Sequence, residues 1–214
     1  MDLDYSINGE ASRFIIIKNI LSPNEIETMG FWLQDKAFIS GACISGKEIP
    51  RKQLWYHNEG KYFCDTWKVK YERWKSQKYD KFLLEIQNKI NTIVNEKLNN
   101  NVSFNSCLIN YYRDGQDTIK PHRDTPYSFG VYPIIANYSY GTTRNMLIKK
   151  IDYNPDNYNS LKHDKNDLMN IDINLEHNSL LIMSGASQKY FTHEIPISKT
   201  NKSRVSFTFR KHIS

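Results

Sequence analysis

The stretch RVSFTFR, residues 204–210, alternates polar and apolar side chains at every position. Its apolar members, Val205, Phe207 and Phe209, fall on one face of an extended chain, because side chains alternate across a β-strand. That face predicts a strand packed on a hydrophobic core. The polar face begins and ends with an arginine, and these two side chains need an explanation of their own.

Other short segments rich in Val, Ile, Tyr and Phe surround this stretch and are separated by turn signals. They are SFNSCLINYY (103–112), YPIIANYSYG (132–141), RNMLIKKI (144–151), SLLIMSG (179–185) and FTHEIP (191–196). Several short strands with turns between them predict an all-β sandwich or barrel. We expect a mainly β fold with a helical buttress (α+β), built as a jelly roll.

The helices of that buttress are expected before the β-rich part. RFIIIKNIL (13–21) predicts a buried strand, and the cap Ser22-Pro23-Asn24-Glu25 then introduces a helix over 26–36. A second helix is expected over 78–98, where apolar residues recur at spacings of three and four.

The chain is expected to form one compact catalytic unit with two parts. Residues 1–100 would supply the helices and a segment of loops and short hairpins over 41–77, and residues 101–214 would form the β core. The polar, Asn-rich stretch 152–170 is expected to be a long surface loop or insertion.

Composition limits the protein class. The 214 residues carry a formal charge of +6, which favours an anionic partner such as nucleic acid, although proteins that bind none also reach this value. Three scattered cysteines indicate reduced thiols and neither a disulfide framework nor a thiolate zinc site. No apolar run approaches the roughly 18 residues of a membrane span, so we expect a soluble, intracellular protein. Nothing specifies an oligomer, and a monomer is expected.

A candidate metal site begins with Pro121-His122-Arg123-Asp124. On a strand, His122 and Asp124 would project from the same face, about 6.6 Å apart at Cα. His193 lies 71 residues further on in another expected strand. Two histidines and one carboxylate compose the facial triad of non-haem Fe(II) oxygenases. An HxD pair alone is also common on solvated strands and turns. Glu194 should point away from the metal, because adjacent strand residues face opposite ways.

The two arginines of the opening stretch, Arg204 and Arg210, would stand about 20 Å apart at Cα on an extended strand. Two long side chains reaching toward each other would leave a gap about the length of a five-carbon diacid. Guanidinium suits bidentate capture of a carboxylate. The alternative is a pair of exposed arginines on an edge strand.

Four segments, in order along the chain, resemble the signature of AlkB-like dioxygenases. NYYRDGQDTIKPHRD (110–124) resembles the family's NxY...DG.D.I..HxD motif, and YSYG (138–141) followed by Arg144 resembles its S-[LF]-G...R strand. NSLLIMSG (178–185) and YFTHEIP (190–196) resemble its GSLLVM.G and W.H.[IV]P segments. The resemblance covers about residues 104 to 212.

This resemblance implies a double-stranded β-helix in which the triad above binds Fe(II). It implies that Arg204 and Tyr112 hold the distal carboxylate of 2-oxoglutarate, while Asn110 and Arg210 lie toward its iron-chelating end. The implied activity consumes 2-oxoglutarate and O2, releases succinate and CO2, and hydroxylates a substrate C–H bond. On an N-methyl group the product collapses to formaldehyde and a free nitrogen.

IPRKQLWYH (49–57) resembles the segment that opens the nucleotide-recognition lid of AlkB-like members acting on nucleic acid. Aromatic residues and lysines follow it, a combination that suits an unstacked base. Tyr56 and Tyr62 are the candidate base platform, and Arg51 and Arg144 are further candidate substrate contacts. The alternative is that the aromatics cover the apolar face of the roll and the lysines are solvated.

One departure from the family pattern bears on the substrate. Members that repair alkylated bases commonly have an acid two residues after the metal-binding Asp, whereas this chain has Pro126 there. Three functions stay open: a demethylase of alkylated DNA or RNA, a dioxygenase acting on a protein or small molecule, and a binding module without catalysis. Turnover stimulated by methylated oligonucleotides would select the first function, and turnover stimulated only by peptides or metabolites would select the second. Absence of turnover under any condition would select the third.

Overall fold

A computed structural model of the chain describes residues 1–43, 45–163 and 169–213. The strands are β1 (Asp2–Ile7), β2 (Glu10–Lys18), β3 (Lys52–His57), β4 (Ser106–Tyr112), β5 (Ile119–His122), β6 (Ile135–Gly141), β7 (Arg144–Lys150), β8 (Asn170–Leu175), β9 (Ser179–Gly185), β10 (Phe191–Ile195) and β11 (Arg204–Arg210). The helices are α1 (Pro23–Gln34), the 3-10 turn η1 (Glu72–Trp74), α2 (Lys81–Leu98), α3 (Pro126–Phe129) and α4 (Ser187–Tyr190).

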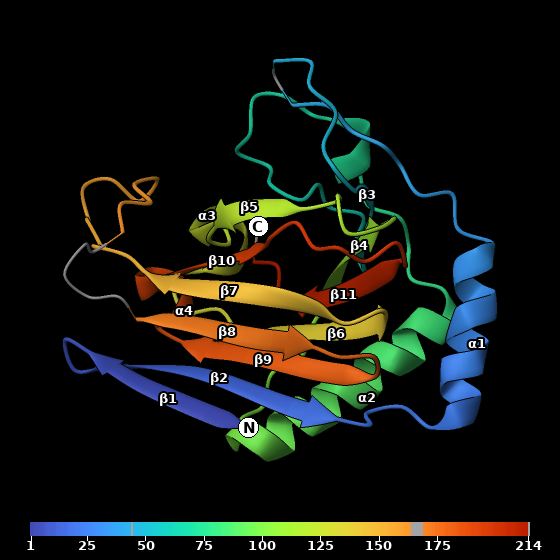
Figure 1. Cartoon of the computed structure of the whole chain (residues 1–214), viewed down its shortest axis with the longest axis horizontal. Coiled ribbons are helices and arrows are strands. Elements are labelled where there is room, and N and C mark those ends of the chain that lie inside the picture. Colours follow the sequence, from blue (N-terminus) through green and yellow to red (C-terminus); the bar gives the residue numbers. More distant parts are fainter. Residues whose placement is uncertain (44, 164–168, 214) are drawn as a thin grey trace.

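The strands form two antiparallel sheets. The large sheet has the order β1-β2-β9-β6-β11-β4-β3, and the small sheet has the order β5-β10-β7-β8. The small sheet lies over part of the large one, and α1 and α2 lie outside the large sheet (Figure 1). The prediction of a mainly β jelly roll with a helical buttress is confirmed.

The large sheet separates two hydrophobic cores. On its helix side, Val205, Phe207 and Phe209 of β11 pack in one cluster with apolar residues of α1 and α2. On its other side, residues such as Leu181 and Met183 of β9 pack with the small sheet. The predicted alternation of β11 is therefore present, and its apolar face stabilises the layer between sheet and helices.

Both predicted long helices form, with small shifts at their starts. Ser22 caps α1 through a capping box with Glu25, as its position before Pro23 indicated. The second helix begins later than predicted because Asp80 is its N-cap, where the carboxylate accepts the N–H of Leu83.

Three strands were not predicted from the sequence. β1 forms a hairpin with β2, the strand that was predicted over 13–21 and that joins the large sheet through β9. β3 arises within the 41–77 segment and pairs with β4. β8 completes the small sheet beside β7. The first hundred residues thus contribute strands to the same sheet as the later ones. The division of the chain at residue 100 stays a prediction.

The described cysteines, Cys43, Cys64 and Cys107, are free thiols. Within the part of the chain that the structure describes, no helix has the length and apolar character needed to cross a bilayer.

The packing of β11 gives a stability prediction. Phe207 is 0% exposed and its ring contacts Trp32 and Tyr138. We expect Phe207→Ala to lower the free energy of unfolding by about 3–5 kcal/mol, because it leaves a cavity in the core. Urea unfolding followed by circular dichroism measures this loss.

The matched control is Phe31→Ala on α1, whose side chain is 62% exposed. Its effect should stay within about 0.5 kcal/mol. Equal losses for the two variants would contradict the assignment of Phe207 to the core.

Candidate active site

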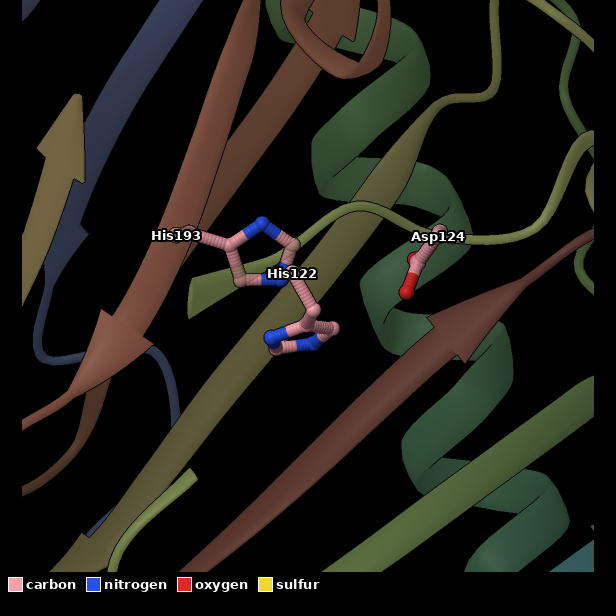
Figure 2. A group of neighbouring side chains, drawn as sticks. All are labelled: His122, Asp124 and His193. Atoms are coloured by element: carbon pink, nitrogen blue, oxygen red, sulfur yellow. The ribbon is translucent and has the colours of Figure 1, made fainter. Parts of the chain in front are cut away.

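The pairing of β5 with β10 brings the two histidines of the candidate triad together. His122 and His193 are directly opposite each other in the antiparallel register, and their ring centroids lie 4.2 Å apart. The ligand atoms of His122, Asp124 and His193 all lie within 4.8 Å of one another. Figure 2 shows the three side chains converging on one space. Elsewhere in the described chain, no other group of three potential ligands comes as close.

Asp124 reaches this space from a loop, and the expectation that it shares a strand with His122 is wrong. β5 ends at His122 and α3 begins at Pro126. The loop backbone is held instead by side chains. The N–H of Asp124 donates to Oε1 of Gln188 at 3.0 Å, and its carbonyl accepts from the Tyr158 hydroxyl at 2.9 Å. Hydrogen bonds of the loop backbone, and not a strand, therefore position the Asp124 carboxylate.

A buried ion pair orients the carboxylate. Arg210 donates from Nε to Oδ2 of Asp124 at 2.5 Å and from Nη2 to Oδ1 at 3.1 Å, and both side chains are 4% exposed. Burial opposes ionisation, yet the charge of Arg210 outweighs it and holds the pKa of Asp124 below its usual value. The carboxylate is thus ionised at neutral pH.

The imidazoles are in their neutral form. Burial, aided by His122, lowers the pKa of His193 to about 3, and burial also lowers the pKa of His122. Nδ1 of His122 lies 2.9 Å from the carbonyl of Lys120, so a proton on Nδ1 leaves Nε2 for a metal. Neutral imidazoles and an ionised carboxylate are the forms that bind metals. These residues fit an Fe(II) ion held by two histidines and one carboxylate.

Arg204 lies on a central strand, between β6 and β4, and is 1% exposed. The alternative of exposed edge arginines is therefore wrong. Its Nη2 donates to Oδ1 of Asn137 at 3.2 Å and to Oγ of Ser139 at 2.8 Å, while its Nε has no hydrogen-bond partner among the residues that the structure describes. Burial lowers the pKa of Arg204 to about 10. A buried guanidinium with an unsatisfied N–H suits an anionic ligand.

Asn110 and Arg51 meet on the same side of the site. Oδ1 of Asn110 accepts from Nε of Arg51 at 3.0 Å and from Nε2 of Gln53 at 2.9 Å. Arg51 also donates to the carbonyl of Thr118 at 3.1 Å. This network holds the guanidinium of Arg51 in place.

One cavity of about 660 Å³ contains most of the predicted site residues. It is lined by all three triad residues and by five further candidates: Arg51, Asn110, Tyr112, Arg204 and Arg210. The structure thus brings together residues from β4, β5, β10, β11 and the 41–77 segment.

Tyr56 and Tyr62, the predicted base platform, do not line this cavity. Tyr56 is 2% exposed and packs on Trp32 and Tyr79 on the helix side of the large sheet, because alternation along β3 turns Gln53 to the cavity and Tyr56 to the core. Tyr62 lies outside the lining, with Nζ of Lys70 at 5.2 Å from its ring.

Arg144 is also placed away from the cavity. It is 2% exposed and donates to four backbone carbonyls: Asp114 at 2.8 Å, Gly115 at 3.5 Å, Asp117 at 2.9 Å and Pro196 at 2.6 Å. Its guanidinium ties the turn before β5 to the end of β10, so the predicted substrate contact is replaced by a structural role.

Sequence reasoning missed several residues that support the site. Gln188 holds the Asp124 backbone, Asn137 and Ser139 hold Arg204, and Trp74 lines the cavity beside Phe63 and Trp67. Ser139 lies in the YSYG motif, which was a usable signal. The other residues were not singled out by a motif, because the role of an amide or an indole depends on where the fold places it.

The triad gives a metal-binding prediction with a control on the adjacent residue. His193→Ala should weaken Fe(II) binding by more than about 100-fold, beyond the 10–100-fold that changes around a metal's ligands cost. Glu194→Gln should leave it unchanged, because Glu194 pairs with Lys149 at 2.8 Å. Anaerobic calorimetric titration with Fe(II) measures both, and equal affinities in the two variants would refute the assignment.

Arg204 gives a prediction on ligand choice. Wild type should bind 2-oxoglutarate more tightly than 2-oxobutyrate, which lacks the distal carboxylate. Arg204→Lys should reduce that preference at least about ten-fold, because an ammonium cannot make the bidentate contact.

The control for Arg204→Lys is Arg13→Lys, whose arginine pairs with Asp4 at the surface. Its preference between the two acids should equal that of wild type in calorimetric titration with the metal present. An unchanged preference in Arg204→Lys would remove Arg204 from the proposed role.

Comparison with known proteins gives the family. The family model described as 2OG-Fe(II) oxygenase superfamily matches residues 13–210. Among curated relatives, the mouse alpha-ketoglutarate-dependent dioxygenase alkB homolog 3 is 36% identical over 113 residues, which is 52% of this chain and 38% of that protein. The bovine DNA oxidative demethylase ALKBH2 is 34% identical over 110 residues, 51% of this chain and 37% of that protein. The chain spans well under half the length of these relatives.

Solved structures show the same fold. The structure of OsALKBH1 superposes with a TM-score of 0.62 at 16% identity, covering 92% of this chain and 97% of that one. A prolyl hydroxylase from Trichoplax adhaerens superposes with a TM-score of 0.58 at 12% identity, covering 93% of this chain and 83% of that one.

These matches confirm the predicted resemblance to AlkB-like proteins, the dioxygenase class, and Fe(II), 2-oxoglutarate and O2 as the cofactor and cosubstrates. With a family match over nearly the whole chain and a cavity whose residues suit those cofactors, the chain belongs to the 2OG-Fe(II) oxygenase superfamily.

Proposed function

We propose that the chain is an oxidative demethylase of alkylated nucleic acid, which removes N-methyl groups from adenine or cytosine in DNA or RNA. The observation that carries this proposal is one wall of the cavity. The 41–77 segment contributes aromatic rings to the same cavity that the candidate metal ligands line. The bovine relative named as a DNA oxidative demethylase supports the same substrate class.

Three aromatic side chains form this wall. Phe63 lies 4.6 Å from Trp74 and 5.7 Å from Trp67 between ring centroids, and all three line the cavity. Trp67 is 38% exposed. Flat, partly exposed rings suit a base that has been turned out of its stack.

The charge of the cavity supports an anionic substrate. Its lining includes two carboxylates, Glu48 and Asp124, and six cationic side chains: Lys47, Arg51, Lys120, Arg123, Arg204 and Arg210. A cleft lined by one sign of charge attracts ligands of the other sign. Both 2-oxoglutarate and the nucleic-acid backbone carry negative charge.

Different residues of this chain would hold the metal and the cosubstrate. His122, Asp124 and His193 would hold Fe(II), and Arg204 with Tyr112 would orient the distal carboxylate of 2-oxoglutarate. When bound, Fe(II), 2-oxoglutarate and O2 supply the oxidation of an N-methyl C–H bond, with succinate and CO2 as products. The resulting N-hydroxymethyl group breaks its C–N bond, and formaldehyde leaves while the ring nitrogen recovers its proton or lone pair.

The second candidate function is oxidation of a protein or small molecule. The observation that favours it is Pro126, which begins α3 beside the metal-binding loop and offers no side-chain hydrogen bond to a base edge.

The decisive experiment uses short DNA and RNA oligonucleotides with 1-methyladenine or 3-methylcytosine. With Fe(II), ascorbate and 2-oxoglutarate, wild type should release one formaldehyde for each base restored to its unmethylated form within the strand. His122→Ala should abolish both, because it removes a proposed metal ligand.

The other outcomes separate the alternatives. Succinate formed without base repair, and stimulated instead by methylated peptides or metabolites, would select the second candidate. Absence of Fe(II)-dependent succinate formation under every condition would favour a binding module without catalysis.

A further inference from the structure

A second hollow of about 660 Å³ opens beside the candidate active-site cavity. The two share Trp67, Arg123 and Thr125 in their walls. The two hollows are therefore neighbours, with these three side chains between them. The proposed function leaves this second hollow without a role.

Three aromatic residues from separate parts of the chain line the second hollow. Trp67 comes from the 41–77 segment, Tyr127 from α3, and Tyr158 from the segment 152–163 between β7 and β8. Tyr127 is 65% exposed and Trp67 is 38% exposed. Exposed rings gathered around one hollow indicate a surface built to contact a flat ligand.

The segment 152–163 is fastened to the active-site loop. The Tyr158 hydroxyl donates to the carbonyl of Asp124 at 2.9 Å, and the guanidinium of Arg123 lies 4.0 Å from the centroid of the Tyr158 ring. Arg123 also donates to the carbonyls of Tyr158, Ser160 and Lys189. Tyr158 is thus held in place before any ligand arrives.

Figure 1 shows this segment, in orange, rising from the end of β7 on the side of the molecule where α3 lies. The prediction of a long loop over 152–170 holds for residues 152–163, and residues 164–168 lie outside the described chain.

We propose that the second hollow is a subsite for the base adjacent to the methylated base in a single-stranded nucleic acid. The inference rests on the proposed function and deepens it. Stacking on aromatic side chains tolerates any base, because every base has a π-face. Arg123, between the two cavities, adds a cation at the step that joins the two nucleotides.

The departure at Pro126 agrees with this arrangement. Thr125, Pro126 and Tyr127 all line the second hollow. Where an acid would contact the edge of the target base, this chain presents an apolar ring and a phenol to the neighbouring base. Part of the recognition is thereby moved from the target base to its neighbour.

The test is a thermodynamic cycle that removes the neighbouring base, the tyrosine, or both. Binding of labelled single-stranded oligonucleotides is followed by fluorescence anisotropy, with the base on the 5′ or the 3′ side of 1-methyladenine replaced by an abasic residue. For one of the two positions, wild type should bind the abasic strand about ten-fold more weakly, within the range that base stacking contributes. Tyr127→Ala should bind both strands equally.

Tyr132→Ala is the matched control. Tyr132 is 53% exposed, follows α3 and lines neither cavity. It should keep the ten-fold difference of wild type. Circular dichroism of the three proteins confirms that each variant is folded.

The outcomes separate the subsite from the proposed function. If wild type binds and repairs the methylated strand but Tyr127→Ala keeps the full abasic difference, the subsite is refuted and the demethylase stands. If wild type shows no abasic difference at either position, the subsite is also refuted. If wild type binds no methylated oligonucleotide, the proposed function fails and the subsite fails with it.

Discussion

The buried ion pair between Arg210 and Asp124 joins the two sheets at the point where the candidate metal ligands meet. Arg210 ends β11 in the large sheet, and Asp124 lies in the loop that leaves β5 of the small sheet. Removing either partner would leave an uncompensated charge in a site that is 4% exposed, which is far costlier than losing a surface pair. The same contact orients the carboxylate and closes the sandwich, so the geometry of the site depends on the packing of the fold.

β11 contributes to both the hydrophobic core and the cavity, because both of its faces are buried. Its apolar residues hold the helix layer, whereas Arg204, Ser206, Thr208 and Arg210 line the cavity. A one-residue slip would move the arginines into the apolar core and the phenylalanines into the cavity. The pairing of β11 with β4 on one side and β6 on the other fixes the register over seven residues. The position of the anion-binding group is therefore set by strand pairing rather than by a flexible loop.

The sequence analysis missed two strands, β1 and β8, whose apolar residues alternate with polar ones in a polar part of the chain. β8 reads NIDINL, and its Ile171, Ile173 and Leu175 are buried between exposed polar neighbours. That period of two was present, but the surrounding Asn-rich stretch obscured it. β1 reads DLDYSI and has the same period of two, and its inward residues are only partly covered.

Two signals led to residues that the structure gathers in one cavity. The triad residues stand in a motif, whereas the arginines of β11 were predicted from strand alternation. Tyr56 was misplaced because nothing local states which face of β3 meets the cavity, and the pairing of β3 with β4 decides it. Depth then separates the cations of that cavity: Arg204 and Arg210 are buried, whereas Lys47 and Lys120 are exposed at its rim. A small dianion can satisfy the deep guanidiniums, while a long polyanion meets only the rim, so the two anions need not compete for the same charges.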